Sequence, residues 1–185
     1  MMNLFRPDMY KKNIFEIDYQ KLKDKGIKCL IFDLDNTLGL LEHERCPVKT
    51  KKLLKSLQKD FLILISSNNT KKRIKPYLKD LGIGGVAFSL KPLTRGLRKI
   101  KRDYGLKKKE MVMIGDQIVT DILSGNKFKI MTILVDPLGK KDLKITGLNR
   151  AVEAKIIKYY NKRGLFERGK YYGWEEYKNL FWLWC

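Results

Sequence analysis

The chain has few of the residues from which zinc sites are built. Its 185 residues include only three cysteines and one histidine. Cys29, Cys46 and Cys185 show no paired spacing, so none of the usual zinc sites is expected. Cys29 falls in an apolar run and is predicted to be a buried small hydrophobe. His43 is expected in a surface loop, with contact to a substrate as the alternative.

Long hydrophobic runs are also missing. The longest strongly apolar run near the C-terminus is Leu180 to Cys185, which is far shorter than the ~20 residues that a membrane-spanning helix needs. The N-terminal stretch has scattered apolar residues and no hydrophobic core of the kind that a signal peptide contains. We therefore expect a cytoplasmic protein without a transmembrane segment. Peripheral association with a membrane remains open.

Acidic residues are scarce relative to basic ones. The chain has 40 Lys and Arg against 20 Asp and Glu, a formal net charge of +20. Residues 71–110 alone hold 14 basic and 3 acidic side chains. Such a surface attracts nucleic acid, acidic lipid headgroups or phosphorylated substrates. Lysines that merely occupy solvated faces would produce the same excess, so charge does not choose the partner, and any nucleic-acid binding is expected to be nonspecific.

Apolar runs alternate with helical segments along the chain. The length suits one domain with a full hydrophobic core. Strands are predicted at residues 27–32, 61–65, 86–88, 111–114 and 130–135, and helices at 47–59, from Thr70 with an interruption or kink at Pro76, at 92–104 and at about 118–124. These repeated βα units predict an α/β fold with a doubly wound, Rossmann-like, mainly parallel sheet. The ligand site of such a sheet lies beyond the carboxyl ends of its strands.

The composition shifts near residue 155. We expect a domain at residues 1–150, including an N-terminal extension, and a basic, aromatic-rich C-terminal helix or tail at 151–185. Residues 159–185 contain all three tryptophans. Such rings favour a membrane interface, and they would equally suit packing on the domain or a dimer contact.

Two aspartates follow the first predicted strand. Asp33 and Asp35 come directly after an apolar run. Because alternate side chains of a strand point the same way, both are expected to face one site. Two crowded carboxylates repel each other unless a divalent cation or a shared proton offsets their charge. The pair therefore indicates a functional site.

Three further strand ends carry polar groups. The segment 66–69 (SSNN) follows the second strand, Lys91 follows the third, and the segment 115–121 (GDQIVTD) follows the fourth. Each group alone is compatible with a turn, a helix cap or a surface position. Their shared placement at carboxyl ends of strands predicts one common site.

Together these groups suit phosphoryl transfer. A carboxylate can attack phosphorus and form an aspartyl-phosphate, provided that cations offset the charge of the phosphate. Mg²⁺ held by carboxylates would supply one cation and Lys91 another. A hydroxyl and backbone amides at Ser67 and Asn68 would hold the phosphate oxygens. The second carboxylate would protonate the leaving group and then activate water.

This arrangement resembles the haloacid dehalogenase (HAD) superfamily of phosphatases over roughly residues 27–136. The matching segments are 33–37 (DLDNT), Ser67, Lys91 and 115–121. The resemblance implies a HAD-like fold, with Asp33 as the nucleophile and Asp35 as the general acid/base. Ser66 remains an alternative to Ser67 as the phosphate-binding serine.

The same resemblance implies the metal site. Mg²⁺ would be bound by Asp33, by the backbone carbonyl of Asp35 and by Asp116. Asp121 would lie in the outer shell of the metal or support Lys91.

The connections between these motifs are too short for a lid domain. About 30 residues separate Asp35 from Ser67, and 24 separate Ser67 from Lys91. We therefore expect a capless enzyme. Since such a site cannot close over a small substrate, its substrate is expected to be large or surface-bound, or the site to be closed by oligomerisation.

The flanking sequence resembles the capless IIIA subgroup, and within it the YqeG-type family, which includes phosphatidylglycerophosphate phosphatases of mitochondria and plastids. The N-terminal stretch, SNN at 67–69, KP at 91–92 and GDQ at 115–117 carry this resemblance. It implies a Mg²⁺-dependent phosphomonoesterase whose best substrate is phosphatidylglycerophosphate, a lipid headgroup at an anionic membrane surface. The alternatives are a phosphatase of a soluble metabolite, nucleotide or phosphoprotein, and a basic RNA- or ribosome-associated binding module.

Overall fold

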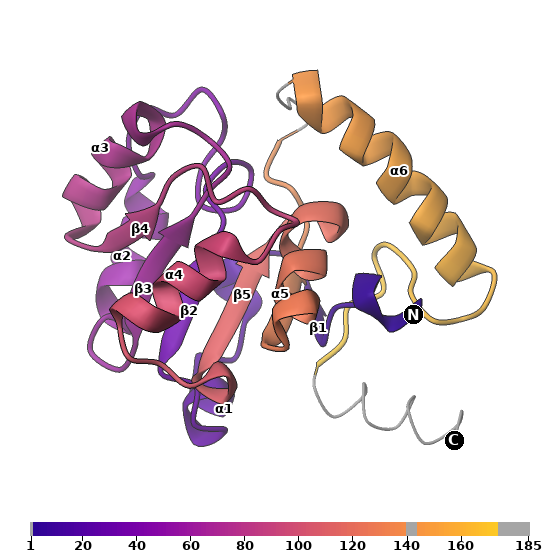
Figure 1. The fold of residues 1–185 in the computed structure, drawn as a ribbon, viewed down its shortest axis with the longest axis horizontal. Helices are drawn as coiled ribbons and strands as arrows, with labels where there is room; N and C mark the ends of the chain where they lie inside the picture. Colours follow the sequence, from indigo (N-terminus) through magenta and orange to yellow (C-terminus); the bar gives the residue numbers. More distant parts are fainter. Residues whose placement is uncertain (1, 140–143, 174–185) are drawn as a thin grey trace.

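Six parallel strands form one sheet that is covered by helices on both faces (Figure 1). The computed structural model describes residues 2–139 and 144–173. The strand order across the sheet is β1-β6-β5-β2-β3-β4. The strands are β1 (Met9–Lys11), β2 (Cys29–Phe32), β3 (Leu62–Ser66), β4 (Gly84–Val86), β5 (Met111–Gly115) and β6 (Met131–Val135). The predicted α/β fold with a parallel sheet is confirmed.

The connections between the strands are mostly helical. The α-helices are α1 (Tyr19–Asp24), α2 (Val48–Leu57), α3 (Lys71–Leu81), α4 (Arg95–Asp103), α5 (Leu123–Phe128) and α6 (Lys144–Asn161). Short 3₁₀ turns at Met2–Phe5, Ile14–Glu16 and Lys108–Glu110 and a π-helical turn at Ile118–Ile122 complete the elements. Within residues 2–139, the β2–β3 and β3–β4 connections each contain a single helix and no added domain.

The central strands are buried on both faces because helices cover both. All four residues of β2 are buried. Leu30 and Phe32 pack in one hydrophobic cluster with residues of α2 and α3, whereas Cys29 and Ile31 pack in another with residues of α4. This alternation follows from the two-residue period of a strand. The predicted burial of Cys29 is confirmed.

The first strand was not among the five predicted from the sequence. β1 has three residues, too few to form a recognisable apolar run, and it pairs with β6 at the edge of the sheet. Its central residue, Tyr10, is fully buried. Tertiary pairing rather than local pattern therefore makes this segment a strand.

Of the two alternatives predicted at Pro76, an interruption of the helix is wrong, and a kink stays a prediction. The helix continues through Pro76 from Lys71 to Leu81. The hydroxyl of Thr70 caps its start by accepting a hydrogen bond from the backbone N–H of Arg73. Buried Ile74 and Tyr77 anchor the helix on the sheet, and this burial outweighs the single backbone donor that proline removes.

Several element boundaries also differ from those predicted. β4 ends at Val86, two residues before the predicted end, and Phe88 is exposed. The strand runs close to its neighbour, since a Cβ atom at Gly85 would lie 2.9 Å from the backbone oxygen of Ile65. The predicted helix at 118–124 is a π-helical turn that leads into α5 and extends to Phe128.

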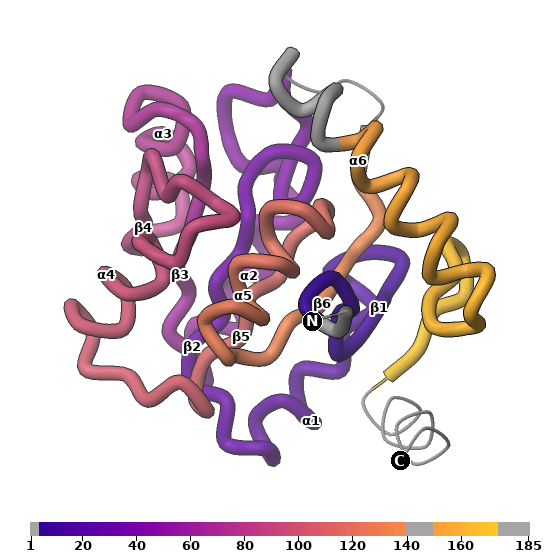
Figure 2. Tube along the Cα trace, turned by 45° about the vertical axis from the view of Figure 1, so that its right-hand side comes forward, coloured from indigo at the N-terminus to yellow at the C-terminus, as the bar shows by residue number. Residues whose placement is uncertain are grey.

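Helix α6 lies at the β1 edge of the sheet, opposite β4 (Figure 2). It crosses residue 150, at which the sequence was divided into two parts; that division stays a prediction. Two aromatic side chains from the predicted tail, Tyr160 and Phe166, are buried against Tyr10 and Ile118. The three tryptophans lie outside the described residues. None of the helices in the described ranges is long and apolar enough to cross a membrane.

Replacing Tyr160 by alanine should test how α6 is attached. Tyr160 is 2% exposed, whereas its neighbour Tyr159 is 39% exposed. Removing the buried ring should lower the free energy of unfolding by about 3 kcal/mol through lost burial and a cavity. Tyr159→Ala is the matched control and should cost less than about 1 kcal/mol. Urea unfolding of both variants measures the difference, and equal losses would show that α6 is not held by this cluster.

Candidate functional site

Four loops at the carboxyl edge of the sheet bring the predicted polar residues together. Asp33 follows β2, Ser66 and Ser67 end and follow β3, Lys91 lies between β4 and α4, and two aspartates follow β5. Carboxylate oxygens of Asp33, Asp116 and Asp121 all lie within 4.8 Å of one another. These three carboxylates therefore lie together at the carboxyl edge, as the sequence predicts; the roles assigned to the site residues stay predictions.

Lys91 lies at the centre of this cluster. Its Nζ atom donates to Asp33 Oδ1 at 2.5 Å, to Asp121 Oδ1 at 2.6 Å and to the backbone oxygen of Ser66 at 2.7 Å. All three protons of the ammonium group therefore have an acceptor. Burial lowers the pKa of Lys91, but the charges of Asp121 and Asp33 outweigh it and raise the pKa above its ordinary value. Lys91 therefore remains a fixed positive charge.

Two of the clustered carboxyl groups are destabilised as anions. Burial raises the pKa of Asp33 well above its ordinary value, against the opposing charge of Lys91. Burial and then the charge of Asp121 raise the pKa of Asp116 to about 7. One lysine thus does not neutralise three buried acids. The oxygen-only donor set is one that Mg²⁺ accepts, and a divalent cation would relieve the remaining repulsion.

Local backbone geometry explains the spacing of the GDQIVTD segment. A Cβ atom at Gly115 would lie 2.3 Å from Asp121 Cγ, so only glycine admits the aspartate at this position. The π-helical turn brings Asp121 back toward the end of β5, and its Oδ2 accepts from the backbone N–H of Gln117 at 3.1 Å. On the other side, Thr37 Oγ1 donates to Asp116 Oδ1 at 3.2 Å.

The two serines have different surroundings. Ser66 Oγ donates to Ser89 Oγ at 3.0 Å and is fully buried. Ser67 Oγ accepts from the backbone N–H of Asn69 at 3.1 Å, and the backbone N–H of Ser67 donates to Val86. Both serines are buried and differ only in their hydrogen-bond partners, so the choice of Ser67 over Ser66 stays a prediction.

Asn68 fastens the loop that carries Lys91. Its side-chain Nδ2 donates to the backbone oxygen of Lys91 at 2.9 Å, and its Oδ1 accepts from the backbone N–H of Lys91 at 2.7 Å. The Asn68 side chain is therefore occupied in positioning the lysine. A contact between Asn68 and phosphate stays a prediction, and it would be made by the backbone amide of Asn68.

Arg73 of α3 lies against the loops that follow β2 and not on a solvated face. Its side chain is 14% exposed. Nε and Nη2 donate to Asp35 Oδ1 at 2.9 and 2.7 Å, and further bonds reach the backbone oxygens of His43 and Leu40. Asn69 Nδ2 adds a bond to Asp35 Oδ2 at 3.2 Å. The Asp35 side chain is thus held by Arg73 of α3 and by Asn69, which precedes that helix.

Arg150 and Glu153 were not foreseen from the sequence, because both lie beyond the segment that carries the family motifs. Arg150 Nη2 donates to Asp116 Oδ2 at 2.5 Å, and Nη1 donates to the backbone oxygen of Asp116 at 3.3 Å. Buried Glu153 accepts from the backbone N–H of Ile118 at 3.1 Å and from Arg168 Nη2 at 2.8 Å. Helix α6 therefore contributes a cation to the edge of the acidic cluster.

Comparison with known sequences places the chain among hydrolases of one superfamily. A family model described as HAD-hydrolase-like matches residues 90–144. The chain is 37% identical over 180 residues to the "Probable phosphatase YqeG" of Bacillus subtilis (strain 168), and the match covers 95% of this chain and 99% of that protein. It is 25% identical over 172 residues to phosphatidylglycerophosphate phosphatase 1, chloroplastic/mitochondrial, of Arabidopsis thaliana, covering 86% of this chain and 49% of that protein. The chain thus spans about half the length of the plant relative.

Solved structures share the fold at low sequence identity. An uncharacterized protein from Listeria monocytogenes serotype 4b aligns with a TM-score of 0.51 at 20% identity, covering 71% of this chain and 99% of that chain. A predicted HAD-like family hydrolase from Porphyromonas gingivalis aligns with a TM-score of 0.51 at 13% identity, covering 69% and 98%. The solved structures thus share the fold, and the sequence matches place the chain in the HAD-like class of hydrolases. Within that class, the chain belongs to the YqeG-type family of HAD-type phosphatases.

The effect of Mg²⁺ on stability should depend on pH. Asp116 has an ordinary pKa of 3.8, which the fold raises to about 7. A raised carboxyl pKa means that the folded state loses stability as the pH rises from about 4 to about 7. Mg²⁺ should offset this loss and so raise the melting temperature more at about pH 8 than at about pH 5.5. Thermal melts with and without Mg²⁺ measure the difference.

The control for this measurement is Asp116→Asn. The variant keeps the size of the side chain but cannot ionise. Its melting temperature should show a much smaller Mg²⁺ effect at either pH. If it responded like the wild-type protein, the cation would be acting elsewhere.

Proposed function

We propose that the protein is a Mg²⁺-dependent phosphomonoester hydrolase that acts through an aspartyl-phosphate on Asp33, with phosphatidylglycerophosphate as its best substrate. The observation that carries this proposal is the contact of Lys91 with Asp33 beside Asp116 and Asp121. A buried carboxylate held next to a fixed cation and two further acids is suited to attack on a phosphate dianion once the remaining charge is offset.

The metal would be held by residues already in place. Asp33, Asp116 and the backbone carbonyl of Asp35 are the proposed ligands, and Asp121 lies close enough to join them or to hold Lys91 instead. Bound Mg²⁺ would supply positive charge against the phosphate oxygens. Arg150, which contacts Asp116, would orient that carboxylate from its outer side, a role typical of groups behind a metal ligand.

The nucleophile is oriented by Lys91. The lysine binds Oδ1 of Asp33, which leaves Oδ2 to attack phosphorus. The new bond joins this oxygen to phosphorus, and the ester bond to the leaving oxygen breaks. The Ser67 hydroxyl and the backbone amide of Asn68 would hold the transferred phosphoryl oxygens, where the negative charge is spread.

Asp35 would handle the protons. It would protonate the leaving alkoxide, then take a proton from the water that attacks the aspartyl-phosphate, so that inorganic phosphate leaves and Asp33 is restored. Arg73 and Asn69 hold its two oxygens. Arg73 is therefore proposed as a positioning residue for Asp35.

The lipid substrate is supported by three observations. The Arabidopsis relative is named for phosphatidylglycerophosphate. The net charge of +20 favours an anionic surface. No added domain covers the carboxyl edge among residues 2–139, so a headgroup could reach the acids without leaving its bilayer.

Asp33→Asn should abolish turnover. The amide cannot serve as the attacking carboxylate, so phosphate release should fall by at least about 10⁴-fold, the order of loss seen when a nucleophile is removed. Phosphate release in the presence of Mg²⁺ measures this effect. Asp60→Asn, which changes an exposed aspartate paired with Lys23, is the control and should retain full activity. Substantial turnover by Asp33→Asn would refute the aspartyl-phosphate mechanism.

The substrate class is tested by competition between lipid and soluble esters. Phosphatidylglycerophosphate in vesicles should show a higher kcat/KM than sugar phosphates, nucleotides or a phosphopeptide, because no lid domain is present within residues 2–139 to close over a small molecule. Initial rates of phosphate release across this panel give the comparison. Preference for a soluble ester would be consistent with the proposed phosphatase activity but would contradict the proposed lipid substrate.

A further inference from the structure

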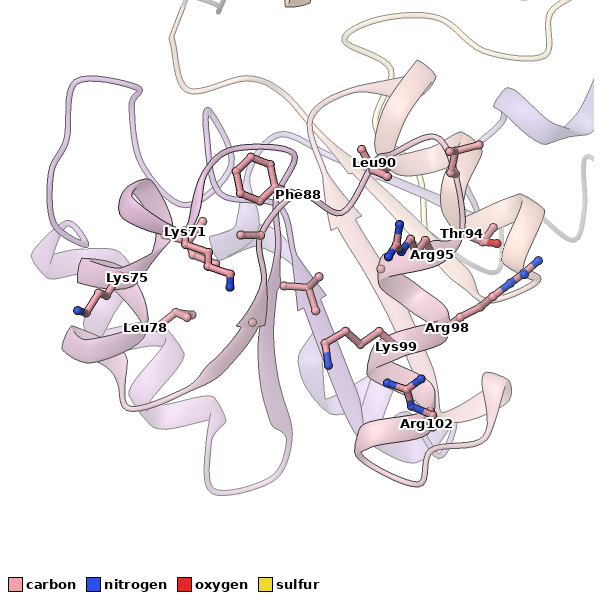
Figure 3. Close-up of a pocket in the computed structure, with 16 residues that line it drawn as sticks. Lys71, Lys75, Leu78, Phe88, Leu90, Thr94, Arg95, Arg98, Lys99 and Arg102 are labelled. Atoms are coloured by element: carbon pink, nitrogen blue, oxygen red, sulfur yellow. The ribbon is translucent and has the colours of Figure 1, made fainter.

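A large groove lies between α3 and α4, along the free edge of β4 (Figure 3). Its volume is about 1200 Å³. Six of its sixteen lining residues are basic and none is acidic. These six residues form the basic rim: Lys71, Lys75, Arg95, Arg98, Lys99 and Arg102. Apolar side chains such as Leu78 and Val86 line the groove between them.

The basic rim is open to solvent and largely uncompensated. All six side chains belong to exposed residues. Lys99 and Arg102 pair with Asp103, whereas the other four have no acidic partner in the part of the chain that the structure describes. In Figure 3, Lys71 extends toward the groove from α3 and Lys99 from α4. The uncompensated charge therefore favours an anionic occupant.

The loop above the groove presents apolar side chains outward. Phe88, Leu90 and Leu93, which we call the apolar crest, are 53%, 46% and 59% exposed. The alternate residues Ser89 and Lys91 point inward and are buried. The loop that supplies the catalytic-site lysine on its inner side thus carries three exposed hydrophobic residues on its outer side. Exposed apolar patches rimmed by polar groups mark interaction sites.

Two features of this surface oppose the stability of the free protein. Phe88 and Leu90 adopt φ angles of 49° and 57°, a left-handed conformation that bulky residues avoid. Lys71 and Arg95 begin α3 and α4, and neither helix has an acidic residue in its first turn. Basic residues there face the positive end of the helix dipole. An anionic partner would explain the basic residues at these two helix N-termini.

We propose that the basic rim and the apolar crest dock the protein on an anionic phospholipid bilayer. The crest would enter the headgroup region while the rim binds lipid phosphates, since binding to such an interface combines buried apolar area with attraction to anionic lipid. A nucleic-acid site would use the basic residues but has no need of exposed leucines. The inference rests on the proposed function only in that docking would turn the loop of Lys91 toward a membrane-borne ester.

The experiment measures binding without turnover. Wild-type protein is titrated with vesicles of phosphatidylcholine that contain phosphatidylglycerol, a phosphodiester on which the proposed reaction cannot occur, and with phosphatidylcholine alone. Co-sedimentation gives the apparent Kd. Wild-type protein should bind only the anionic vesicles, and more weakly as salt is raised.

One variant pair tests the basic rim. Lys71→Gln/Arg95→Gln should bind anionic vesicles about 30-fold more weakly, the equivalent of about 1 kcal/mol for each basic residue. The matched control is Lys59→Gln/Lys109→Gln, which removes two exposed charges at the opposite, amino edge of the sheet. This control should bind within about threefold of wild type, because net charge alone has little effect at that distance.

A second pair tests the apolar crest. Phe88→Asn/Leu90→Asn removes both hydrophobic side chains and places asparagine where it tolerates a positive φ. Vesicle binding should fall at least tenfold while the melting temperature is unchanged or higher, which separates lost docking from unfolding.

The proposal is overturned if wild-type protein ignores anionic vesicles, or if both groove variants bind them like wild type. RNA binding of the same variants is measured in parallel. The proposal is also overturned if the rim variant loses binding to both RNA and vesicles while the crest variant keeps both, since the groove would then be a general polyanion site. Loss of vesicle binding in both variants, with the control intact, supports it. Phosphate release is not measured in this experiment, so failure of docking and failure of the phosphatase proposal are separate results.

Discussion

The ammonium group of Lys91 is the charge on which the architecture of the site depends. It joins Asp33 at the end of β2 to Asp121 after β5, and it also binds the backbone at the end of β3. Three loops far apart in sequence are thereby held at one point. Without this cation, buried carboxylates within 4.8 Å of one another would repel, and their desolvation would be uncompensated.

Two arginines hold further acids at the carboxyl edge of the sheet. Arg73 holds Asp35 from α3, and Arg150 holds Asp116 from α6. Each acid of the site is thus oriented by a basic side chain on a helix or a loop that packs against the sheet. Such an arrangement keeps the carboxylates in fixed directions, but only two cations, Lys91 and Arg150, contact the three clustered acids Asp33, Asp116 and Asp121. A divalent cation is the species that this deficit suits.

The loop after β4 links the interior of the site to the outer surface. Alternate residues face opposite ways, so Ser89 and Lys91 are buried while Phe88 and Leu90 are exposed. Asn68 fastens the loop by bonding both backbone groups of Lys91. The exposed residues Phe88 and Leu90 are therefore next in sequence to residues of the site, and Lys91 between them and α4 contacts Asp33 directly.

The sequence by itself determined strands β2 to β6, helices α2 to α5 and the placement of three aspartates and a lysine at the carboxyl edge of the sheet. Apolar runs that end in polar residues are local patterns, and parallel strands bring their carboxyl ends to one edge. Tertiary structure alone decided that β1 is a strand, that Arg73 faces Asp35, and that Arg150 reaches Asp116. Those pairings join segments up to 124 residues apart. No periodicity or motif encodes such contacts, because they arise only when burial of the core places one helix or loop against another.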